Sequence, residues 1–453
     1  MEQEAVRPPS SWRAAALVGA LSAVLGAVTL GHKSFWFDEA YDGLHVRDSW
    51  ASVFDLIGTT EMSQAAYHVL LKAWATVTPD SEIWLRLPSV LAAALAAALL
   101  VPLGTRLFDR TTGIVAGVLL ATNELLVRWS QQARTYALVT LAVVVASLLL
   151  LRALDDPRRR NWLLYAIAAA VAVYCHFYAG LVVVAHFASL PFAPRRPPLR
   201  RVLEAGVAFL ILIGPALYFT ATAQREQLGW IEEASLARIW RLTEVATGHN
   251  AVLGLMVAAG LALLAYEAGA GTRIAGFRLA LVGGWVALPI VLGLLVSAWQ
   301  PILVPRYAIV ITPALALAGA VAIAAIARAR REVAACALVV LIAVSGYRIV
   351  DWYRGEAEDW RGAVAYVASE RRPNDAVIVA PKWATDAFRY YDTTTPVAFA
   401  PPTGRTIALV RATERDDPVE IVSGVLGPAN QLEVVSEQRF GHNLRVQVLE
   451  PPR

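Results

Sequence analysis

Long apolar segments alternate with short, arginine-rich stretches along the first 350 residues of the chain. Most of these segments hold about 17–25 mostly apolar residues, the length that an α-helix needs to cross the hydrocarbon core of a bilayer. The pattern predicts about eleven membrane spans, at 14–30, 85–104, 111–127, 135–153, 161–177, 178–193, 202–220, 251–268, 279–297, 303–327 and 332–350. Between the fifth and sixth, Tyr174–Tyr178 indicates either a tight turn or a broken helix.

The first apolar segment, Ala14–Leu30, follows Arg7 and Arg13 and so shares the charge pattern of a secretory signal. It is long for the core of a signal peptide, and no small-residue cleavage site precedes Phe35. We therefore expect it to be retained as the first membrane span.

The arginines predict the orientation of the spans, because cytoplasmic loops carry an excess of basic residues. With a cytoplasmic N-terminus, every predicted inner loop is basic, through Arg106, Arg110, Arg152, Arg158–Arg160, Arg195, Arg196, Arg200, Arg201, Arg273, Arg278, Arg328, Arg330 and Arg331. The loop 31–84, the turns 128–134 and 298–306, the loop 221–250 and the C-terminal tail then lie outside. We expect a multi-pass protein of the bacterial inner membrane with an extracytoplasmic C-terminal domain.

The first outer loop, 31–84, has a helical pattern of its own. One set of apolar residues recurs at helical spacing from Trp50 to Ile57, and a second recurs from Tyr67 to Trp74. This spacing predicts two amphipathic helices in the membrane interface. Residues 1–350, including this loop, are expected to form one transmembrane domain.

The tail, 351–453, changes in character. Helical periodicity at Trp360–Val367 precedes a strand pattern at Asp375–Ala380 and a helix around Thr385–Tyr391. Further strand-like runs lie at 406–411, 431–436 and 443–449. These patterns predict a small soluble α/β domain, and it contains no GxGxxG motif, Walker loop or nucleophile elbow.

The composition agrees with a polytopic membrane protein, since 57% of the residues are apolar, 17% are charged, and the mean hydropathy is +0.52. The basic residues gather in short clusters between apolar runs, which argues against a nucleic-acid partner. Cys175 and Cys336 lie inside apolar segments without a CxxC or Cys/His pattern, so we expect neither a disulfide scaffold nor a zinc site.

Two adjacent carboxylates, Asp38 and Glu39, stand just past the first span and are bracketed by aromatic residues. Ionised groups at a lipid boundary are costly and are often functional, and either carboxylate could take a proton from a hydroxyl group. The structural alternative is that Asp38 caps a short helix, with Glu39 in its first turn.

Cationic residues are predicted on the same side and at the same depth as the carboxylates: Arg134, Arg306 and Lys72. Such cations could clamp a phosphate group, although snorkelling or contact with lipid headgroups would also explain them. His176, between Tyr174 and Tyr178, and His68 could contact a sugar or a metal, or could be structural. The spacing of acidic and histidine residues indicates no metal site, and no cofactor is expected, although a divalent metal remains possible.

The motifs stand in a recognisable order: Asp38-Glu39-Ala40-Tyr41, Ala133-Arg134-x-Tyr136-Ala137-Leu138, His176-x-Tyr178, Arg306-Tyr307 before an apolar span with Pro313, and Glu358-Asp359-Trp360-Arg361. Together they resemble the polyprenyl-phosphate-dependent glycosyltransferases of the GT-C class, in particular family 39 or the aminoarabinose-transferase-like branch. The resemblance covers most of the chain and is best in residues 30–190 and 300–395.

The resemblance implies an inverting transfer of one sugar from a polyprenyl-phosphate donor to an extracytoplasmic glycan, glycolipid or protein. It assigns Asp38 as the general base and Glu39 as its partner. Donor-binding candidates are Arg134, Arg306, Lys72, Tyr136, His176 and Tyr307, and acceptor-side candidates are Tyr41, Tyr67 and His68. Relatives often carry a Pro-Pro-Leu-Tyr-like run where this chain has Ala65-Ala66-Tyr67-His68.

The sequence leaves two other functions as alternatives. A transporter or flippase would place ionisable groups near the bilayer midplane and often contains internal repeats, neither of which the sequence shows. A ligase would transfer a whole glycan from a lipid pyrophosphate. The bias toward arginine and alanine suggests a high-GC, actinobacterial source, for which mannose or an arabinose-like sugar is plausible.

Overall fold

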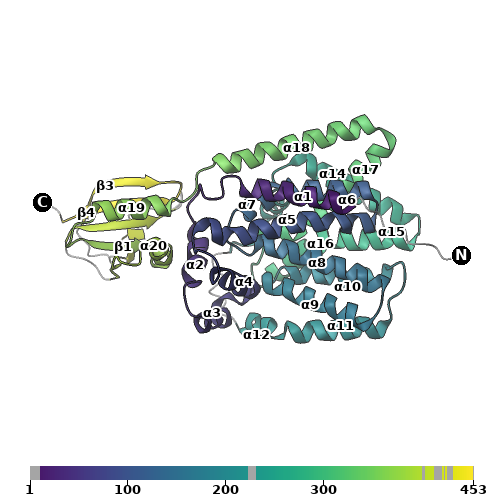
Figure 1. The fold of residues 1–453 in the computed structure, drawn as a ribbon, viewed down its shortest axis with the longest axis horizontal. Helices are drawn as coiled ribbons and strands as arrows, with labels where there is room; N and C mark the ends of the chain where they lie inside the picture. The colour runs from purple at the N-terminus through teal and green to yellow at the C-terminus, as the bar shows by residue number, and fades with distance from the viewer. Residues whose placement is uncertain are drawn as a thin grey trace.

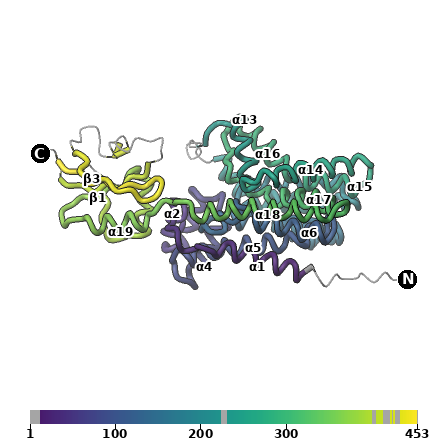
Figure 2. The backbone as a smooth tube through the Cα atoms, turned by 90° about the horizontal axis from the view of Figure 1, so that it is seen from above, coloured from purple at the N-terminus to yellow at the C-terminus, as the bar shows by residue number. Residues whose placement is uncertain are grey.

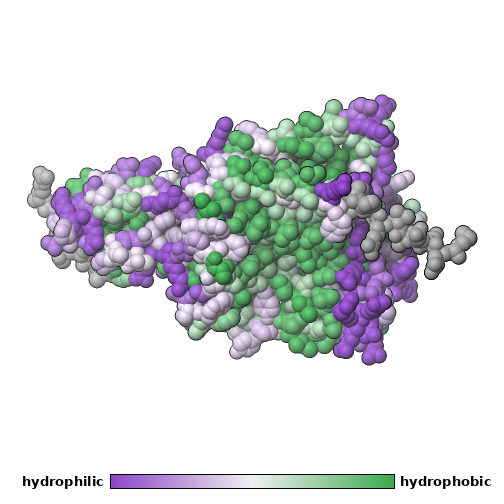
Figure 3. All heavy atoms as spheres, in the orientation of Figure 1, coloured by the Kyte–Doolittle hydropathy of each residue, from purple (hydrophilic) through white to green (hydrophobic). Residues whose placement is uncertain are grey.

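A computed structural model describes residues 11–222, 231–399, 404–412, 421–422, 424–425 and 432–451. A bundle of long helices makes up most of the molecule, and a small domain with a sheet lies at one end of its long axis (Figure 1). A broad apolar band covers the bundle between polar regions at its two ends (Figure 3). This surface is the one expected of a protein that crosses a bilayer.

Each predicted span except 111–127 coincides with a helix or with consecutive helices. The helices are α1 (Ser11–Ala27), α5 (Glu82–Leu107), α6 (Arg110–Ala121), α8 (Tyr136–Asp155), α9 (Arg159–Cys175), α10 (Ala179–Ser189), α11 (Leu199–Leu212) with α12 (Gly214–Thr222), α14 (Ala251–Gly269), α15 (Arg273–Arg278) through η5 (Leu279–Gly283) to α16 (Gly284–Ser297), η6 (Pro305–Ile311) with α17 (Thr312–Ala329), and α18 (Arg331–Arg354). The interruption at Tyr174–Tyr178 is a short turn between α9 and α10.

Six helical segments in the described part of the chain are long and apolar enough to cross a membrane. A seventh results if α11 and α12, which are bent by 49° relative to each other, form one span. Three shorter apolar helices, in α1, α6 and the α10 region, fall below that length. The fold is thus a polytopic helical bundle, and the count of eleven spans stays a prediction.

The segment α17 forms the centre of the bundle, since 89% of the best apolar window in Pro305–Ala329 is buried. Gly260 of α14 lies against the backbone of α17, where an added Cβ would fall 1.8 Å from the carbonyl oxygen of Ala318. Small residues let membrane helices approach this closely and pack by van der Waals contact. The central helix thereby holds η6, which carries Arg306, at the end of the bundle near the small domain.

The prediction of a single span at 111–127 was wrong. Helix α6 ends at Ala121, and Asn123 begins a separate helix, α7 (Glu124–Ser130). The Asn123 side chain accepts a hydrogen bond from the Leu126 N–H and donates one to the Ala246 carbonyl oxygen. This N-cap explains the break, because its side chain satisfies a backbone donor that the end of a helix leaves unpaired.

The first outer loop folds into short helices. These are α2 (Phe37–His45), α3 (Trp50–Leu56), the turns η1 (Ile57–Glu61) and η2 (Met62–Gln64), and α4 (Ala65–Ala75). Helices α3 and α4 occupy the two stretches for which the sequence predicts amphipathic helices. A further short helix, α13 (Leu236–Ala246), follows α12 and precedes α14 in the chain.

The C-terminal domain is an α/β unit, as predicted. Helices α19 (Trp360–Glu370) and α20 (Thr385–Tyr391), with the turn η7 (Lys382–Ala384), accompany strands β1 (Ala376–Ala380), β2 (Thr406–Arg411), β3 (Glu433–Phe440) and β4 (Leu444–Glu450). The strand order is β1-β2-β4-β3, with β1 and β2 parallel and the other neighbours antiparallel. Part of the predicted run 431–436 lies outside the described residues. Helix α18 leads from the bundle into this domain (Figure 2).

Candidate active site

Helix α2 carries the carboxylates and lies between the bundle and the C-terminal domain (Figure 1). It begins at Phe37 with Trp36 as the N-cap residue, so Asp38 is not the cap. Asp38 and Glu39 occupy its first turn, where negative charge is stabilised by the unpaired N–H groups. Four residues after Asp38, Asp42 lies on the same face of the helix.

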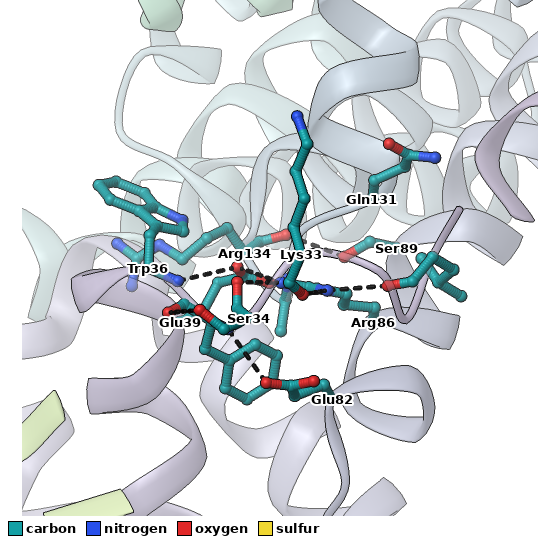
Figure 4. A network of polar contacts seen from close by, with 12 residues as sticks. Lys33, Ser34, Trp36, Glu39, Glu82, Arg86, Ser89, Gln131 and Arg134 are labelled. Atoms are coloured by element: carbon teal, nitrogen blue, oxygen red, sulfur yellow. Dashed lines mark hydrogen bonds and ion pairs between the residues drawn. The ribbon is translucent and has the colours of Figure 1, made fainter. Parts of the chain in front are cut away.

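Glu39 is buried in an ion pair with Arg86 of α5. Arg86 Nε lies 2.8 Å from Glu39 Oε1, and Nη2 lies 2.8 Å from Oε2. The same guanidinium donates to the carbonyl oxygens of Leu30, Lys33 and Ser34, and Glu39 Oε1 accepts from the Ala133 N–H at 2.7 Å (Figure 4). With these partners the Glu39 carboxylate holds α2 in place.

Asp38 and Asp42 both face Arg134, which is 7% exposed. Arg134 Nη1 lies 2.7 Å from Asp42 Oδ2, and its Nη2 lies 3.7 Å from Asp38 Oδ2. The two carboxylates differ in accessibility, because the Asp38 side chain is 22% exposed and that of Asp42 is fully buried. Asp38 is therefore the carboxylate of this group that a substrate can reach.

A second polar layer lies behind Asp42. His68 Nε2 is 4.0 Å from Asp42 Oδ1 and 3.5 Å from Glu61 Oε2. Burial raises the pKa of Asp42 to about 6, although the nearby Arg134 and His68 offset part of that rise. Burial acts in the same direction on Glu61, but there the contact with His68 outweighs it and the pKa is lowered. The adjacent Tyr67 is buried, and among the described residues its hydroxyl group has no hydrogen-bond partner.

An aromatic group surrounds Arg306 on the bundle side of the site. Arg306 forms hydrogen bonds with the side chains of Tyr136 and Tyr307. It also interacts electrostatically with Asp38 and Arg134. The ring of His176 lies 4.4 Å from that of Tyr307 and 5.9 Å from that of Tyr136. The structure thus brings together Arg134, Arg306, Tyr136, His176 and Tyr307, all predicted from the sequence as donor-side residues.

Lys72 has a different environment. Its Nζ donates to the carbonyl oxygens of Val46 and Asp48, just after the end of α2. Cations at that position complement the unpaired carbonyl groups of a helix C-terminus. Lys72 therefore fastens the end of α2, and among the described residues its side chain donates to these carbonyl groups rather than lying with the donor-side arginines.

Of the acceptor-side candidates, Tyr41 is partly exposed on α2, while Tyr67 and His68 are buried in the layer behind Asp42. Sequence reasoning missed Arg86, Asp42 and Glu61. The spacing of four residues between Asp38 and Asp42 is a signal that could have identified Asp42. Within the described ranges, no group of three or more His, Cys, Asp or Glu side chains could hold a metal ion.

The C-terminal domain closes on the N-terminal side of α2. Tyr391 Oη donates to Glu82 and accepts from the Phe35 N–H at 2.7 Å. The Tyr390 ring lies 5.0 Å from that of Phe35. These contacts make the domain a wall of the site rather than a separate appendage.

Comparison with known protein families finds a match over part of the chain. Residues 66–219, from α4 into α12, match the family described as "Dolichyl-phosphate-mannose-protein mannosyltransferase". A search of curated protein sequences finds no significant match.

Several solved structures share the fold. ArnT from Cupriavidus metallidurans in the apo state superposes with a TM-score of 0.59 at 13% identity, covering 95% of this chain and 97% of that one. ArnT bound to undecaprenyl phosphate gives a TM-score of 0.59 at 14% identity, with the same coverage. The Archaeoglobus fulgidus oligosaccharyltransferase in the apo form gives 0.57 at 12% identity, covering 87% of this chain and 65% of that one.

The chain therefore has the fold of the GT-C membrane glycosyltransferases.

Proposed function

We propose that this protein is a membrane glycosyltransferase that moves a single sugar, mannose or an arabinose-like sugar, from a polyprenyl-phosphate donor to an extracytoplasmic acceptor. The observation that carries the proposal is the accessible carboxylate of Asp38, held 3.7 Å from the buried Arg134 in the fold of this enzyme class. Solved structures of that fold include one with undecaprenyl phosphate bound, which supports a lipid-phosphate donor.

The proposed reaction is a single displacement. Asp38 accepts the proton of an acceptor hydroxyl group, whose oxygen attacks the anomeric carbon of the donor sugar. The bond between that carbon and the phosphate oxygen breaks, and the polyprenyl phosphate leaves with the electron pair. The configuration at the anomeric carbon is inverted.

The two arginines have different parts in this proposal. Arg134 is already paired with Asp42 and faces Asp38, so it orients the base. Arg306 lies among tyrosine hydroxyl groups, and this cationic, hydrogen-bonding pocket suits the charge that develops on the leaving phosphate. Tyr136, Tyr307 and His176 shape that pocket. Both arginines lie at the end of the bundle nearest the C-terminal domain, where a polyprenyl chain could stay in lipid.

We place this site outside the cytoplasm, on the basis of the basic loops that the sequence predicts to be cytoplasmic. The protein would then be a multi-pass protein of a bacterial plasma membrane with a cytoplasmic N-terminus. The acceptor is a glycan, a glycolipid or a protein on the outer side.

A transporter would need ionisable groups near the bilayer midplane. His186 is a buried histidine inside the bundle, and its two ring nitrogens lie 3.0 Å from Ser147 Oγ and 3.2 Å from Tyr165 Oη. Because both of its ring nitrogens have hydrogen-bond partners on neighbouring helices, His186 contributes to helix packing. The charged cluster at Asp38, Asp42 and Arg134 instead collects at one end of the bundle, which favours transfer over transport.

The test uses the purified protein in proteoliposomes with radiolabelled polyprenyl-phospho-mannose or polyprenyl-phospho-arabinose and a membrane extract as acceptor. A glycosyltransferase releases free polyprenyl phosphate and labels the acceptor. A flippase leaves the donor intact, and a ligase accepts only a pyrophosphate-linked glycan. An intact phosphate donor under every condition would overturn the proposal.

A further inference from the structure

A row of aromatic rings runs along the exposed side of α2. Phe37, Tyr41 and His45 recur every four residues, with ring centroids 6.4 and 4.3 Å apart. Trp383 of the C-terminal domain extends the row, since its ring lies edge-on to Phe37 at 4.6 Å. We call these four residues the aromatic row.

The row is accessible although it lies beside a buried charge network. Phe37, Tyr41 and His45 are partly exposed, and Trp383 is 50% exposed. The residue that follows Phe37 along the chain is Asp38, and the residue that follows Tyr41 is Asp42. The side chains of Asp38 and Asp42 thus point about 100° around α2 from the row, and a ligand on the row at Phe37 lies on the same turn of the helix as the proposed base.

The orientation of the Trp383 side chain is fixed by a neighbouring arginine. The guanidinium of Arg411 packs over its ring at 5.1 Å. Arg411 is in turn fixed by Glu358, whose Oε1 lies 2.8 Å from Nε and 2.7 Å from Nη2. Glu358 also accepts from Trp360 Nε1 at 2.9 Å. A half-exposed tryptophan with this much support is pre-organised for a ligand, and less conformational entropy is then lost on binding.

The chemistry of the row indicates the kind of ligand. Aliphatic side chains would suit a prenyl or acyl chain, whereas this row offers flat ring faces with polar edges, from the tyrosine hydroxyl and from His45 Nε2, the other ring nitrogen of His45 being bonded to the Tyr41 carbonyl oxygen. A sugar ring has the matching pattern, with C–H groups on its faces and hydroxyl groups around its rim. Aromatic side chains bury large areas while their polar edges still reach hydrogen-bond partners.

We propose that the acceptor is a carbohydrate and that the aromatic row, completed by Trp383 of the C-terminal domain, is its binding site. This proposal rests on the proposed transferase function and specifies its acceptor. The C-terminal domain then supplies part of the acceptor site and selects a chain of sugars over a single hydroxyl compound.

Saturation-transfer NMR on the full-length protein in detergent, without donor, tests this proposal. The probes are a soluble α-mannotetraose, an α-arabinotetraose and a serine- and threonine-rich peptide. We expect transfer to the ring protons of at least one tetrasaccharide, with binding about tenfold weaker in Trp383→Ala and closer to wild type in Trp383→Phe. Trp299→Ala removes an exposed tryptophan outside the row and should leave binding unchanged.

Asp38→Asn separates the two proposals, because it should abolish sugar transfer yet keep oligosaccharide binding. Loss of transfer activity with intact binding in that variant supports both. Oligosaccharide binding without sugar transfer in the wild type overturns the proposed reaction but not the proposal that the aromatic row binds a carbohydrate. Absence of tetrasaccharide binding, binding of the peptide instead, or equal binding by a folded Trp383→Ala protein overturns the carbohydrate site.

Discussion

Arg86 and Glu39 form a two-point ion pair beneath α2 in which both side chains are almost completely buried. Glu39 neighbours the proposed base, but its oxygens are used by Arg86, the Ala133 N–H and, at 3.4 Å, the Trp36 N–H. The adjacent carboxylates Asp38 and Glu39 therefore separate into an accessible one and a structural one.

The first prediction concerns that separation. Glu39→Gln leaves a buried arginine without its counter-charge, and breaking a buried pair in this way costs about 3–5 kcal/mol. We expect a clearly lower midpoint of thermal unfolding in detergent. Asp38→Asn, the matched change at the neighbouring residue, should shift the midpoint far less because its side chain is partly exposed. A Glu39→Gln protein with wild-type stability but no activity would assign Glu39 to the chemistry instead.

The second prediction follows from Asp42. Burial raises the pKa of its carboxyl group from 3.8 to about 6. Between these values the folded protein holds the proton more firmly than the unfolded chain, so this group's contribution to stability falls as the pH rises from about 4 to 6. The loss amounts to about 3 kcal/mol.

Thermal unfolding of the wild type and of Asp42→Asn at several pH values measures this contribution. The stability of the wild type relative to the variant should decrease as the pH increases from 4 to 7. Parallel stability profiles for the two proteins would contradict the burial argument.

The third prediction addresses the leaving group. Arg306→Ala removes a charge-assisted contact worth about 1.5–3 kcal/mol, so kcat/KM for the polyprenyl-phosphate donor should drop roughly 10- to 100-fold. Arg306→Lys keeps the charge but loses the forked geometry, and its activity should lie in between. Initial rates at varied donor and acceptor concentrations provide the measurement. An equal loss with respect to both substrates would count against a phosphate clamp.

The fourth prediction tests how the C-terminal domain seats on α2. A Cβ added at Gly43 would lie 2.8 Å from Tyr390 Cε2 and 3.0 Å from Phe35 Cε2, both on buried rings. Gly43→Ala should therefore destabilise the protein by about 1–3 kcal/mol. Gly58→Ala in the same outer loop meets no atom within 4 Å and serves as the control. If the two substitutions had the same effect on unfolding, the domain would not be packed on α2 as described.

The positions of the helices could largely be predicted, because the thickness of the bilayer sets the length and apolarity of a membrane span, and both can be recognised in the sequence. The break at Asn123 was missed although its N-cap bond, accepted from the Leu126 N–H, is local; the second bond of this side chain, to the Ala246 carbonyl oxygen more than a hundred residues away, cannot be read from the sequence. The strands β1 and β2 followed from their apolar runs between turn residues.

The site was predicted only in part. Asp38, Arg134 and Arg306 stand out because the sequence predicts them together on the outer side, where the positive-inside bias makes arginines less expected. Arg86, by contrast, falls at the start of a predicted span, a position typical of an arginine at the membrane interface. Only the folded structure shows that its guanidinium pairs with Glu39. Its predicted depth places Lys72 beside the arginines, whereas its side chain reaches the end of α2.

The most direct test of the central claim is the rate of polyprenyl phosphate release by Asp38→Asn, purified and shown by thermal unfolding to be folded. The substitution keeps the size of the side chain and removes its basicity. The account predicts a loss of about 10²- to 10⁴-fold relative to the wild type, the typical contribution of a general base. Release at a rate near that of the wild type would contradict the assignment of Asp38 as the base.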